Sequence, residues 1–480
     1  MPLELYNTMG RELQEFKPLV EGKAGFYGCG PTVYNYAHIG NMRAYVFQDV
    51  LKRSLRFLGY DVTHVMNITD IGHLSGDADD GEDKMVKTAK ERGQSVLEIA
   101  QFYTDAFFND TDRLNIERPT VVCKATDHVE QMIELIKKLE KNGHTYMAGG
   151  NLYYDISTFP EYGKLARINI EDLKAGARID VDENKRNPHD FVLWFTKSKF
   201  ENQALVWDSP WGKGYPGWHI ECSAMSMEYL GEQIDIHTGG IDHIQIHHTN
   251  EIAQSEGATG KTWVNFWLHN EFLVMDKGKM SKSSGTFLTL QTIIDQGFDP
   301  LDYRFFLLGA HYRSQITFSP ESMESAKSAR KNLVQRIARI LETAGKPESI
   351  PDSRELPAGS PALERLEAFR RHIEQDLNTP RALSELQGLV RDAEIKPGEA
   401  LAVLQAMDGV LGLKLLESAL QSIAEAAPQE GDPRIEALIE ERKAAKQSKN
   451  FARADEIRNL LKAEGIVLED SPTGTTWKRM

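Results

Sequence analysis

The sequence predicts an α/β fold in which a doubly wound parallel sheet carries an inserted segment and is followed by an α-helical C-terminal region. A strand, a turn-rich loop, a helix and a second strand follow one another within residues 24–66. Gly, Pro, Asp and Asn are frequent in residues 149–216, and the chain after about Leu290 has helical character. Because 480 residues are too many for one ordinary hydrophobic core, we expect several domains in contact.

The first crossover is the clearest element. Residues 24–29 are predicted as a buried strand, and residues 61–66 as a second strand. Between them, a helix over residues 41–58 places its apolar residues on one face: Val46, Val50, Leu51, Leu55 and Leu58. Since ligands of such folds bind at the carboxyl ends of the parallel strands, the loop before this helix is the first place to look for a site.

The middle of the chain interrupts the sheet. A second amphipathic helix follows Thr126 and Asp127, and the turn-rich residues 149–216 are predicted to be an insertion between two halves of the sheet. The sheet resumes near Gly217, with strand-like residues 233–237 and 263–275.

The remainder is predicted to be helical apart from short breaks. A linker rich in Pro, Gly and Ser covers residues 345–361, and two helices are expected over residues 433–447 and 452–464.

Composition describes a globular protein and leaves its partners open. Hydrophobic residues make up 41% and charged residues 26% of the chain, and the net charge is −15, which argues against a protein that coats nucleic acid through bulk charge. A local basic face stays open as an alternative. No membrane-length apolar run and no secretory signal are present, so we expect a cytoplasmic enzyme without membrane contact. The three cysteines, Cys29, Cys123 and Cys222, exclude a disulfide framework.

His38, Ile39, Gly40 and Asn41 lie between the first strand and its helix. A helix N-terminus presents unpaired N–H groups and a positive dipole end to phosphate, His38 can donate to a phosphate oxygen, and Gly40 lets the backbone approach a nucleotide. A helix-capping role for His38 is the alternative.

Residues 279–283 form a second motif, Lys-Met-Ser-Lys-Ser, in a loop bracketed by Gly278 and Gly285. Lys279 and Lys282 would neutralise a triphosphate as negative charge moves onto pyrophosphate. Alone, such a pentapeptide is typical of a solvated surface loop. Its position after the sheet, combined with the first motif, argues against coincidence.

The two motifs together resemble the signatures of class I aminoacyl-tRNA synthetases. The resemblance implies a Rossmann-like catalytic domain that activates a carboxylic acid as an adenylate. It also implies that His38, Lys279 and Lys282 are catalytic. The ATP-binding residues would be His38, Gly40, Asn41, Asp242, Lys279 and Lys282. Asn41 stands where the class often has His, but its side chain can still donate a hydrogen bond.

Within the class, the chain resembles cysteinyl-tRNA synthetases from the first strand to the C-terminus, at residues 30–34, 207–212, 217–225, 247–254 and 465–470. The resemblance implies the following segments: first half of the catalytic domain (1–125), connective insertion (126–216), second half with the lysine loop (217–290), helical stem-contact region (291–345) and helical anticodon-binding region (346–480).

Four scattered residues form a candidate metal site: Cys29, Cys222, His247 and Glu251. Two thiolates, an imidazole and a carboxylate suit zinc, and His247 and Glu251 share one helix face, but spacing alone equally allows two structural cysteines and a polar helix start. The resemblance implies one Zn²⁺ per chain, which takes the substrate's sulfur as an added ligand. It also implies that Thr69, Trp218 and His237 contact cysteine.

Some positions depart from the family pattern. Residues 71–83 are longer and more acidic than expected, and Thr249 stands where an acidic residue is expected. His243 and His248 crowd the metal site, where we expect them to support the ligands. Cys123 receives no role.

The predicted function is therefore ligation of L-cysteine to tRNA(Cys), with ATP and Mg²⁺ as substrate, by an enzyme expected to be a monomer. A ligase that transfers the adenylate to a small amine and a non-catalytic tRNA-binding paralogue are the alternatives. Against the small-amine ligase stands the basic stretch at residues 440–458, which suits phosphate contacts, although its glutamates also fit a solvated helix pair.

Overall fold

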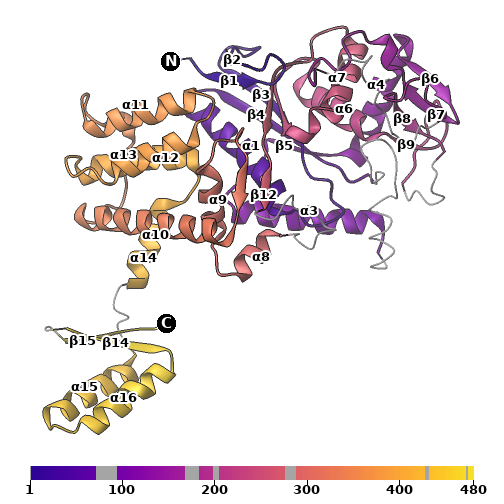
Figure 1. Ribbon diagram of the computed structural model, residues 1–480. Helices are drawn as coiled ribbons and strands as arrows, with labels where there is room; N and C mark the ends of the chain where they lie inside the picture. The colour runs from indigo at the N-terminus through magenta and orange to yellow at the C-terminus, as the bar shows by residue number, and fades with distance from the viewer. Residues whose placement is uncertain are drawn as a thin grey trace. The chain divides into compact units, whose positions relative to one another are not determined.

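The computed structural model describes residues 2–71, 94–167, 183–197, 205–275, 288–426, 432–471 and 474–479 (Figure 1). Its central element is a five-stranded parallel sheet with the strand order β11-β10-β3-β4-β5. The strands are β3 (Lys23–Gly28), β4 (Asp61–Ile68), β5 (Val121–Lys124), β10 (Ile234–Gly240) and β11 (Val264–Asn270).

The strand order reverses between β3 and β10. From β3 the chain proceeds outward through β4 to β5, whereas the second half of the sheet adds β10 directly beside β3 and then β11. In the β3–β10 pair, His237 lies opposite Tyr27 and Thr238 lies opposite Gly28. A crevice at the carboxyl ends of such a strand pair is the usual ligand site of doubly wound sheets.

Helices connect and cover the strands. α1 (Ile39–Phe57) links β3 to β4 and contacts β4, β10 and β11, while α6 (Trp218–Leu230) contacts β3 and β4. α3 (Val96–Arg113) precedes β5, and α4 (Val129–Lys141), α6 and α7 (His247–Thr259) pack on one another. The predicted first crossover is confirmed, with the helix beginning two residues earlier than expected.

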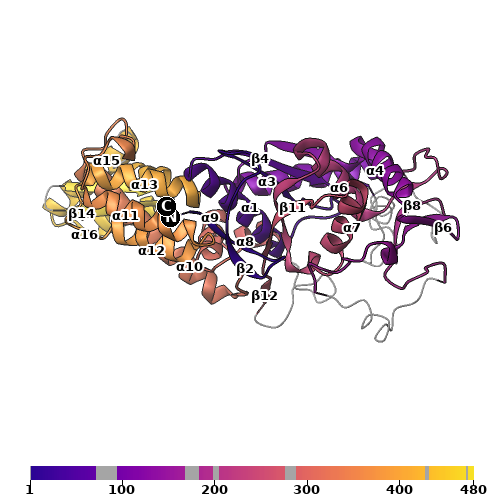
Figure 2. The ribbon, with the colours of Figure 1, turned by 90° about the horizontal axis from the view of Figure 1, so that it is seen from above.

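One buried core joins the sheet, α4, α6, α7 and the insertion. Its largest members include Tyr27, Tyr154, Trp194, Trp263 and Trp267. The insertion contains an antiparallel sheet of four strands in chain order: β6 (Thr145–Ala148), β7 (Asn151–Tyr154), β8 (Phe191–Phe195) and β9 (Tyr215–Pro216). Figure 2 shows β6 and β8 beyond α4.

Further short elements surround the catalytic sheet. An N-terminal hairpin pairs β1 (Glu4–Asn7) with β2 (Glu12–Glu15), and β12 (Leu273–Met275) pairs in parallel with β13 (Ile316–Phe318). The helices that follow β12 are α8 (Leu290–Asp295), α9 (Pro300–Leu308), α10 (Pro320–Thr343), α11 (Pro361–Glu374), α12 (Thr379–Leu389), α13 (Pro397–Leu411), α14 (Leu415–Ala426), α15 (Pro433–Gln447) and α16 (Phe451–Ala463).

The chain ends in strands rather than helices, which the sequence analysis did not predict. β14 (Ile466–Ser471) and β15 (Gly474–Arg479) form an antiparallel hairpin. Trp477 on β15 and Ile466 on β14 are buried against α15 and α16, so the hairpin is held by tertiary packing. Neither strand alternates apolar and polar residues, so the sequence carries little strand signal here.

The chain divides into two compact units. One comprises Met1–Asn332 and Glu348–Lys414, and the other comprises Leu333–Pro347 and Leu415–Met480. Within the described parts of both units, no helix has the length and apolar character that crossing a membrane requires.

Candidate active site and metal centre

His38 is the N-cap of α1. Its Nδ1 accepts a hydrogen bond from the Asn41 backbone N–H at 3.0 Å, and the Asn41 Oδ1 accepts one from the His38 N–H at 3.2 Å. The capping alternative is thus observed, and it has a chemical consequence. Because Nδ1 is an acceptor, a neutral His38 ring holds its proton on Nε2, which is the atom that would donate to a phosphate.

Gly40 lies under the His38 ring. A Cβ atom at this position would stand 3.0 Å from both Nδ1 and Cε1 of His38, closer than real Cβ contacts allow without a shift. The glycine therefore allows the ring to fold over the first turn of α1.

Residues 276–287, which contain Lys279 and Lys282, lie outside the described residues, but the chain on both sides of them is described. β12 ends at Met275, and on the other side the Leu288 carbonyl accepts a hydrogen bond from the Ile39 N–H at 2.9 Å. Thr289 forms an antiparallel bridge with His38. The chain that follows the second motif, at Leu288 and Thr289, therefore lies beside the first motif.

The four predicted metal ligands come together although they are far apart in sequence. One donor atom from each of Cys29, Cys222, His247 and Glu251 lies within 4.8 Å of the others, and all four residues are buried. Cys29 follows the carboxyl end of β3, Cys222 lies on α6, and the remaining two lie one turn apart on α7. This cluster is at the strand-order reversal beside β10.

Cys29 also takes part in two other groupings, one with His243, His247 and His248 and one with His237, His248 and Glu251. The Cys29 Sγ is 3.5 Å from His248 Nε2, whose ring contacts His269 at 2.8 Å through Nδ1. A hydrogen bond from Cys222, together with those of the neighbouring histidines, outweighs burial and lowers the pKa of Cys29 well below its ordinary value. Thiolate formation at Cys29 is what metal binding requires.

Glu251 is a buried carboxylate with an unusual environment. His237 Nε2 and His247 Nε2 lie 2.8 and 2.7 Å from its two oxygens, yet within the described residues neither oxygen has a properly directed hydrogen bond. Burial opposes its ionisation, but the charges of the two histidines hold the pKa of Glu251 well below its ordinary value. A buried anion whose oxygens lack hydrogen bonds fits a site for a cation.

The residues predicted to contact cysteine lie around this cluster. The Trp218 ring stacks on His247 with ring centroids 4.4 Å apart, and His237 is fully buried between Glu251 and Trp267. Thr69 Oγ1 donates to Glu221 Oε2 at 3.1 Å, so its hydroxyl hydrogen is already used. Asp242 lies in a short 3-10 turn after β10 and is exposed.

Sequence reasoning missed three buried side chains here. Glu221 accepts from Thr69, the Nδ1 atoms of His219 and His247 are 2.9 Å apart, and His269 contacts His248 and Thr8. His269 lies on β11, and only the strand order brings it beside the cluster, so no spacing in the sequence points to it. Cys123 packs in the core, where burial raises its thiol pKa to about 12, in keeping with the absence of an assigned role.

The basic stretch at residues 440–458 is largely paired with carboxylates. Arg442 makes a two-point contact with Asp470 at 2.8 and 2.9 Å, and Lys446 binds the same carboxylate at 2.8 Å. Lys443 and Arg453 pair with neighbouring glutamates. Within the described part of the chain, Lys449 and Arg458 have no such ion pair, which leaves these two cations best suited to phosphate contacts.

Comparisons with known proteins agree with this arrangement. A family described as "tRNA synthetases class I (C) catalytic domain" matches residues 15–328, and one described as "Cysteinyl-tRNA ligase anticodon binding domain" matches residues 429–477. Cysteine–tRNA ligases of Treponema denticola, Treponema pallidum and Borrelia turicatae are 65%, 48% and 45% identical to the chain, and each match covers both chains in full.

Among solved structures, Mycobacterium tuberculosis methionyl-tRNA synthetase in complex with methionyl-adenylate matches with a TM-score of 0.56 at 15% identity, over 84% of this chain and 92% of that one. This likeness concerns the fold alone. The small-amine ligase and the non-catalytic paralogue have no support in these matches. By its catalytic domain, its anticodon-binding domain and its full-length relatives, the chain belongs to the cysteine–tRNA ligase family of class I tRNA synthetases.

Proposed function

We propose that this chain activates L-cysteine with ATP and Mg²⁺ to give cysteinyl adenylate and pyrophosphate, and then transfers cysteine to the 3′ end of tRNA(Cys). The observation that carries the proposal is the meeting of two sites at one edge of the sheet. The cluster of Cys29, Cys222, His247 and Glu251 lies beside β3, and the N-terminus of α1 follows β3 by one loop. Activation of cysteine requires a site that binds the substrate thiol next to a site that binds the phosphates of ATP.

The cluster fits one Zn²⁺ per chain. Two thiols, an imidazole and a carboxylate are zinc ligands, and the buried Glu251 oxygens lack hydrogen bonds within the described residues. When bound there, zinc would favour a thiolate over a hydroxyl and so select cysteine against serine, two substrates that an apolar pocket separates only by ~10²-fold. His243, His248 and His269 would orient the ligands from behind.

The phosphates would be held at the start of α1. His38 donates from Nε2, Gly40 lets the ring lie over the helix end, and Asn41 completes the cap in this chain. Lys279 and Lys282 would stabilise the charge that develops on the leaving pyrophosphate, and Asp242 would contact the nucleotide. Adenylate formation needs no protein nucleophile, because the substrate carboxylate itself attacks the α-phosphate.

The amino acid would lie between Trp218, His237 and Thr69. Trp218 covers His247, so it can close the pocket over a metal-bound thiol. Thr69 already donates to the buried Glu221, so its hydroxyl would serve as an acceptor for the substrate ammonium group.

We assign the remaining segments from the family resemblance: residues 126–216 to the connective insertion, 291–345 to the stem-contact region and 346–480 to the anticodon-binding region. The match of residues 429–477 to an anticodon-binding domain supports the last assignment and tRNA(Cys) as partner. A monomer that works in the cytoplasm completes the proposal.

Two assays on the purified chain test the proposal. Cysteine-dependent exchange of pyrophosphate into ATP tests adenylate formation, and charging of purified tRNA(Cys) tests transfer. Exchange without charging would favour transfer to a small amine, and absence of exchange from zinc-loaded protein would exclude the activation step.

A further inference from the structure

Arg43 lies near the start of α1, two residues after Asn41, and its side chain donates hydrogen bonds to four backbone carbonyl oxygens. The guanidinium donates to the carbonyl oxygens of Phe272 and Ser314 at 2.5 Å each, and to those of Tyr312 and His311 at 3.3 and 3.4 Å. The residue is 5% exposed, and burial lowers its pKa to about 10, so it stays charged at neutral pH.

Two of these carbonyls lie just before strands. Phe272 immediately precedes β12, which leads into residues 276–287, and Ser314 precedes β13, the parallel partner of β12. Arg43 thus connects the start of α1 to the bases of both strands. On the far side of the lysine-bearing segment, Leu288 accepts from Ile39. The first two turns of α1 therefore hold both flanks of that segment.

We propose that Arg43 is a positioning residue for adenylate formation, which sets where the chain enters the lysine-bearing segment relative to His38. This inference rests on the proposed function and adds a residue to it. A planar guanidinium carries five donors spread over three nitrogens and can reach diverging carbonyl oxygens, whereas the three donors of a lysine ammonium radiate from a single nitrogen and reach fewer of them.

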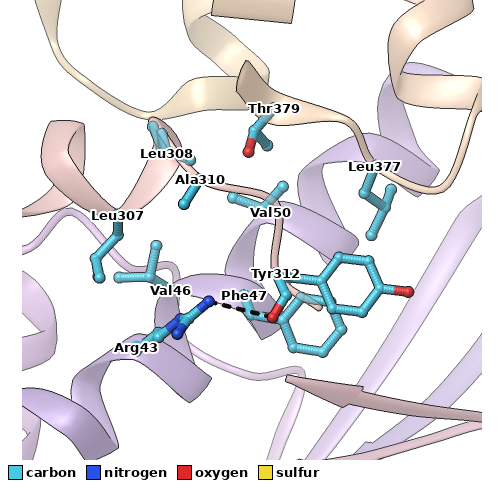
Figure 3. A pocket seen from close by; sticks show the side chains of 10 residues that line it. All are labelled: Arg43, Val46, Phe47, Val50, Leu307, Leu308, Ala310, Tyr312, Leu377 and Thr379. Carbon is cyan, nitrogen blue, oxygen red and sulfur yellow. Dashed lines mark hydrogen bonds between the residues drawn. The ribbon is translucent and has the colours of Figure 1, made fainter. Parts of the chain in front are cut away.

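The Arg43 guanidinium lies between a small cavity and the chain that leads into β13. The cavity of about 30 Å³ borders the guanidinium and is lined on the side of α1 by Val46, Phe47 and Val50 (Figure 3). Figure 3 shows the Arg43–Tyr312 hydrogen bond at the edge of this cavity. Phe47 stacks on Tyr312 with ring centroids 4.4 Å apart, so aromatic packing supports this part of the chain, whereas the Arg43 hydrogen bonds hold the carbonyls of Phe272 and Ser314.

Arg53 provides a matched control on the same helix. It is 9% exposed, and its guanidinium donates to the carbonyls of Gly409 at 3.0 Å and Asn115 at 2.9 Å. Unlike Arg43, it also pairs with the carboxylates of Asp49 at 2.8 Å and Glu117 at 3.2 Å, but none of these partners adjoins the lysine-bearing segment. Arg43→Lys and Arg53→Lys therefore make the same chemical change at equally buried sites of one helix, and only the first alters the link to the two strands.

The test measures three steps for both variants and the unmodified chain. Rates of cysteine-dependent pyrophosphate exchange are expressed per active site, counted by burst formation of adenylate, so that misfolded protein does not enter the comparison. KM values for ATP and cysteine and zinc content are measured on the same samples. Transfer of cysteine from isolated enzyme-bound adenylate to tRNA is followed in a single turnover.

We expect Arg43→Lys to lower the exchange rate per site by ~10- to 100-fold, the cost of a small misplacement of catalytic groups, with an unchanged KM for cysteine, zinc content and transfer rate. Arg53→Lys should stay within about twofold of the unmodified chain in exchange. As a second variant, Arg43→Ala should regain exchange when methylguanidinium is added, because the added ion can occupy the space left by the side chain and donate to the same carbonyls.

Equal exchange rates in Arg43→Lys and Arg53→Lys would overturn the inference and leave the proposed function intact. Equal losses in exchange and transfer would also overturn it, since they indicate a general structural effect. Absence of exchange in the unmodified chain would instead refute the proposed function, and the inference with it.

Discussion

The double role of His38 leads to a prediction that separates helix capping from phosphate binding. Substitution by Asn keeps a side chain that caps helices well, and substitution by Ala removes both functions. The cap uses Nδ1, which accepts from the Asn41 N–H at 3.0 Å, whereas binding of a phosphate would use the proton on Nε2. His38→Asn therefore removes the donor to phosphate and keeps the helix cap.

The expected magnitudes follow from this geometry. Loss of an N-cap costs about 1 kcal/mol of stability, so His38→Ala should lower the free energy of unfolding by that amount and His38→Asn should change it little. Loss of one preorganised donor to a charge that develops in the transition state costs about 3 kcal/mol, or ~10²- to 10³-fold in rate. Both variants should therefore lose pyrophosphate exchange to this extent.

Urea unfolding and cysteine-dependent exchange, measured on the same preparations, provide the two readouts. The reasoning is refuted if His38→Asn exchanges within threefold of the unmodified chain, because His38 would then be a cap and nothing more. A large loss of stability in His38→Asn would contradict the capping half of the argument. Asn41→Ala breaks the side-chain half of the capping box without removing the imidazole, so its urea unfolding shows how much that half of the box contributes to stability.

Three further predictions concern stability and tRNA binding. Asp49→Asn should lower the free energy of unfolding by about 3–5 kcal/mol in urea titrations, because it leaves the fully buried Arg304 without the carboxylate that it binds at 2.5 Å; a loss below 1 kcal/mol would contradict this. Burial, only partly offset by Arg113, raises the pKa of Asp110 from 3.8 to about 6, so folding favours its protonated form. Asp110→Asn should therefore be more stable than the unmodified chain at pH 8 and equally stable near pH 3. Thermal melts in which Asp110→Asn is less stable than the unmodified chain at pH 8 would contradict this prediction. Lys449→Gln should weaken tRNA binding and reduce the slope of log K against log salt by about 1, whereas an unchanged slope in filter binding would place this cation away from phosphate.

The sequence was sufficient for the first crossover of the sheet, and it predicted strands at the positions of β10 and β11 but not β5. Strand, loop and helix from residue 24 to residue 66 have local periodicities that do not depend on the rest of the chain, and the structure confirms them. The grouping of Cys29 with Cys222 and α7 could not come from local pattern, because only the strand order places β3 beside β10. There the family resemblance supplied what spacing lacked.

Other features depend on tertiary contacts that no local pattern contains. The hairpin at the C-terminus exists because Trp477 packs on α15 and α16, and neither of its strands alternates apolar and polar residues in the sequence. In the sequence, Arg43 is one more cation on an amphipathic helix. Only the fold shows that it binds the carbonyls of Phe272 and Ser314. Likewise, His269 reaches the cluster only through the fold.

The central claim is that this chain recognises cysteine through a metal-bound thiolate beside its nucleotide site. The most direct measurement compares pyrophosphate exchange with cysteine and with serine on samples whose zinc content is determined, before and after chelation and for Cys222→Ser. The account predicts about one zinc per chain, exchange with cysteine that exceeds exchange with serine by well over ~10²-fold, and loss of both metal and cysteine exchange in Cys222→Ser. Undiminished exchange with cysteine in metal-free protein, or comparable exchange with serine, would contradict it.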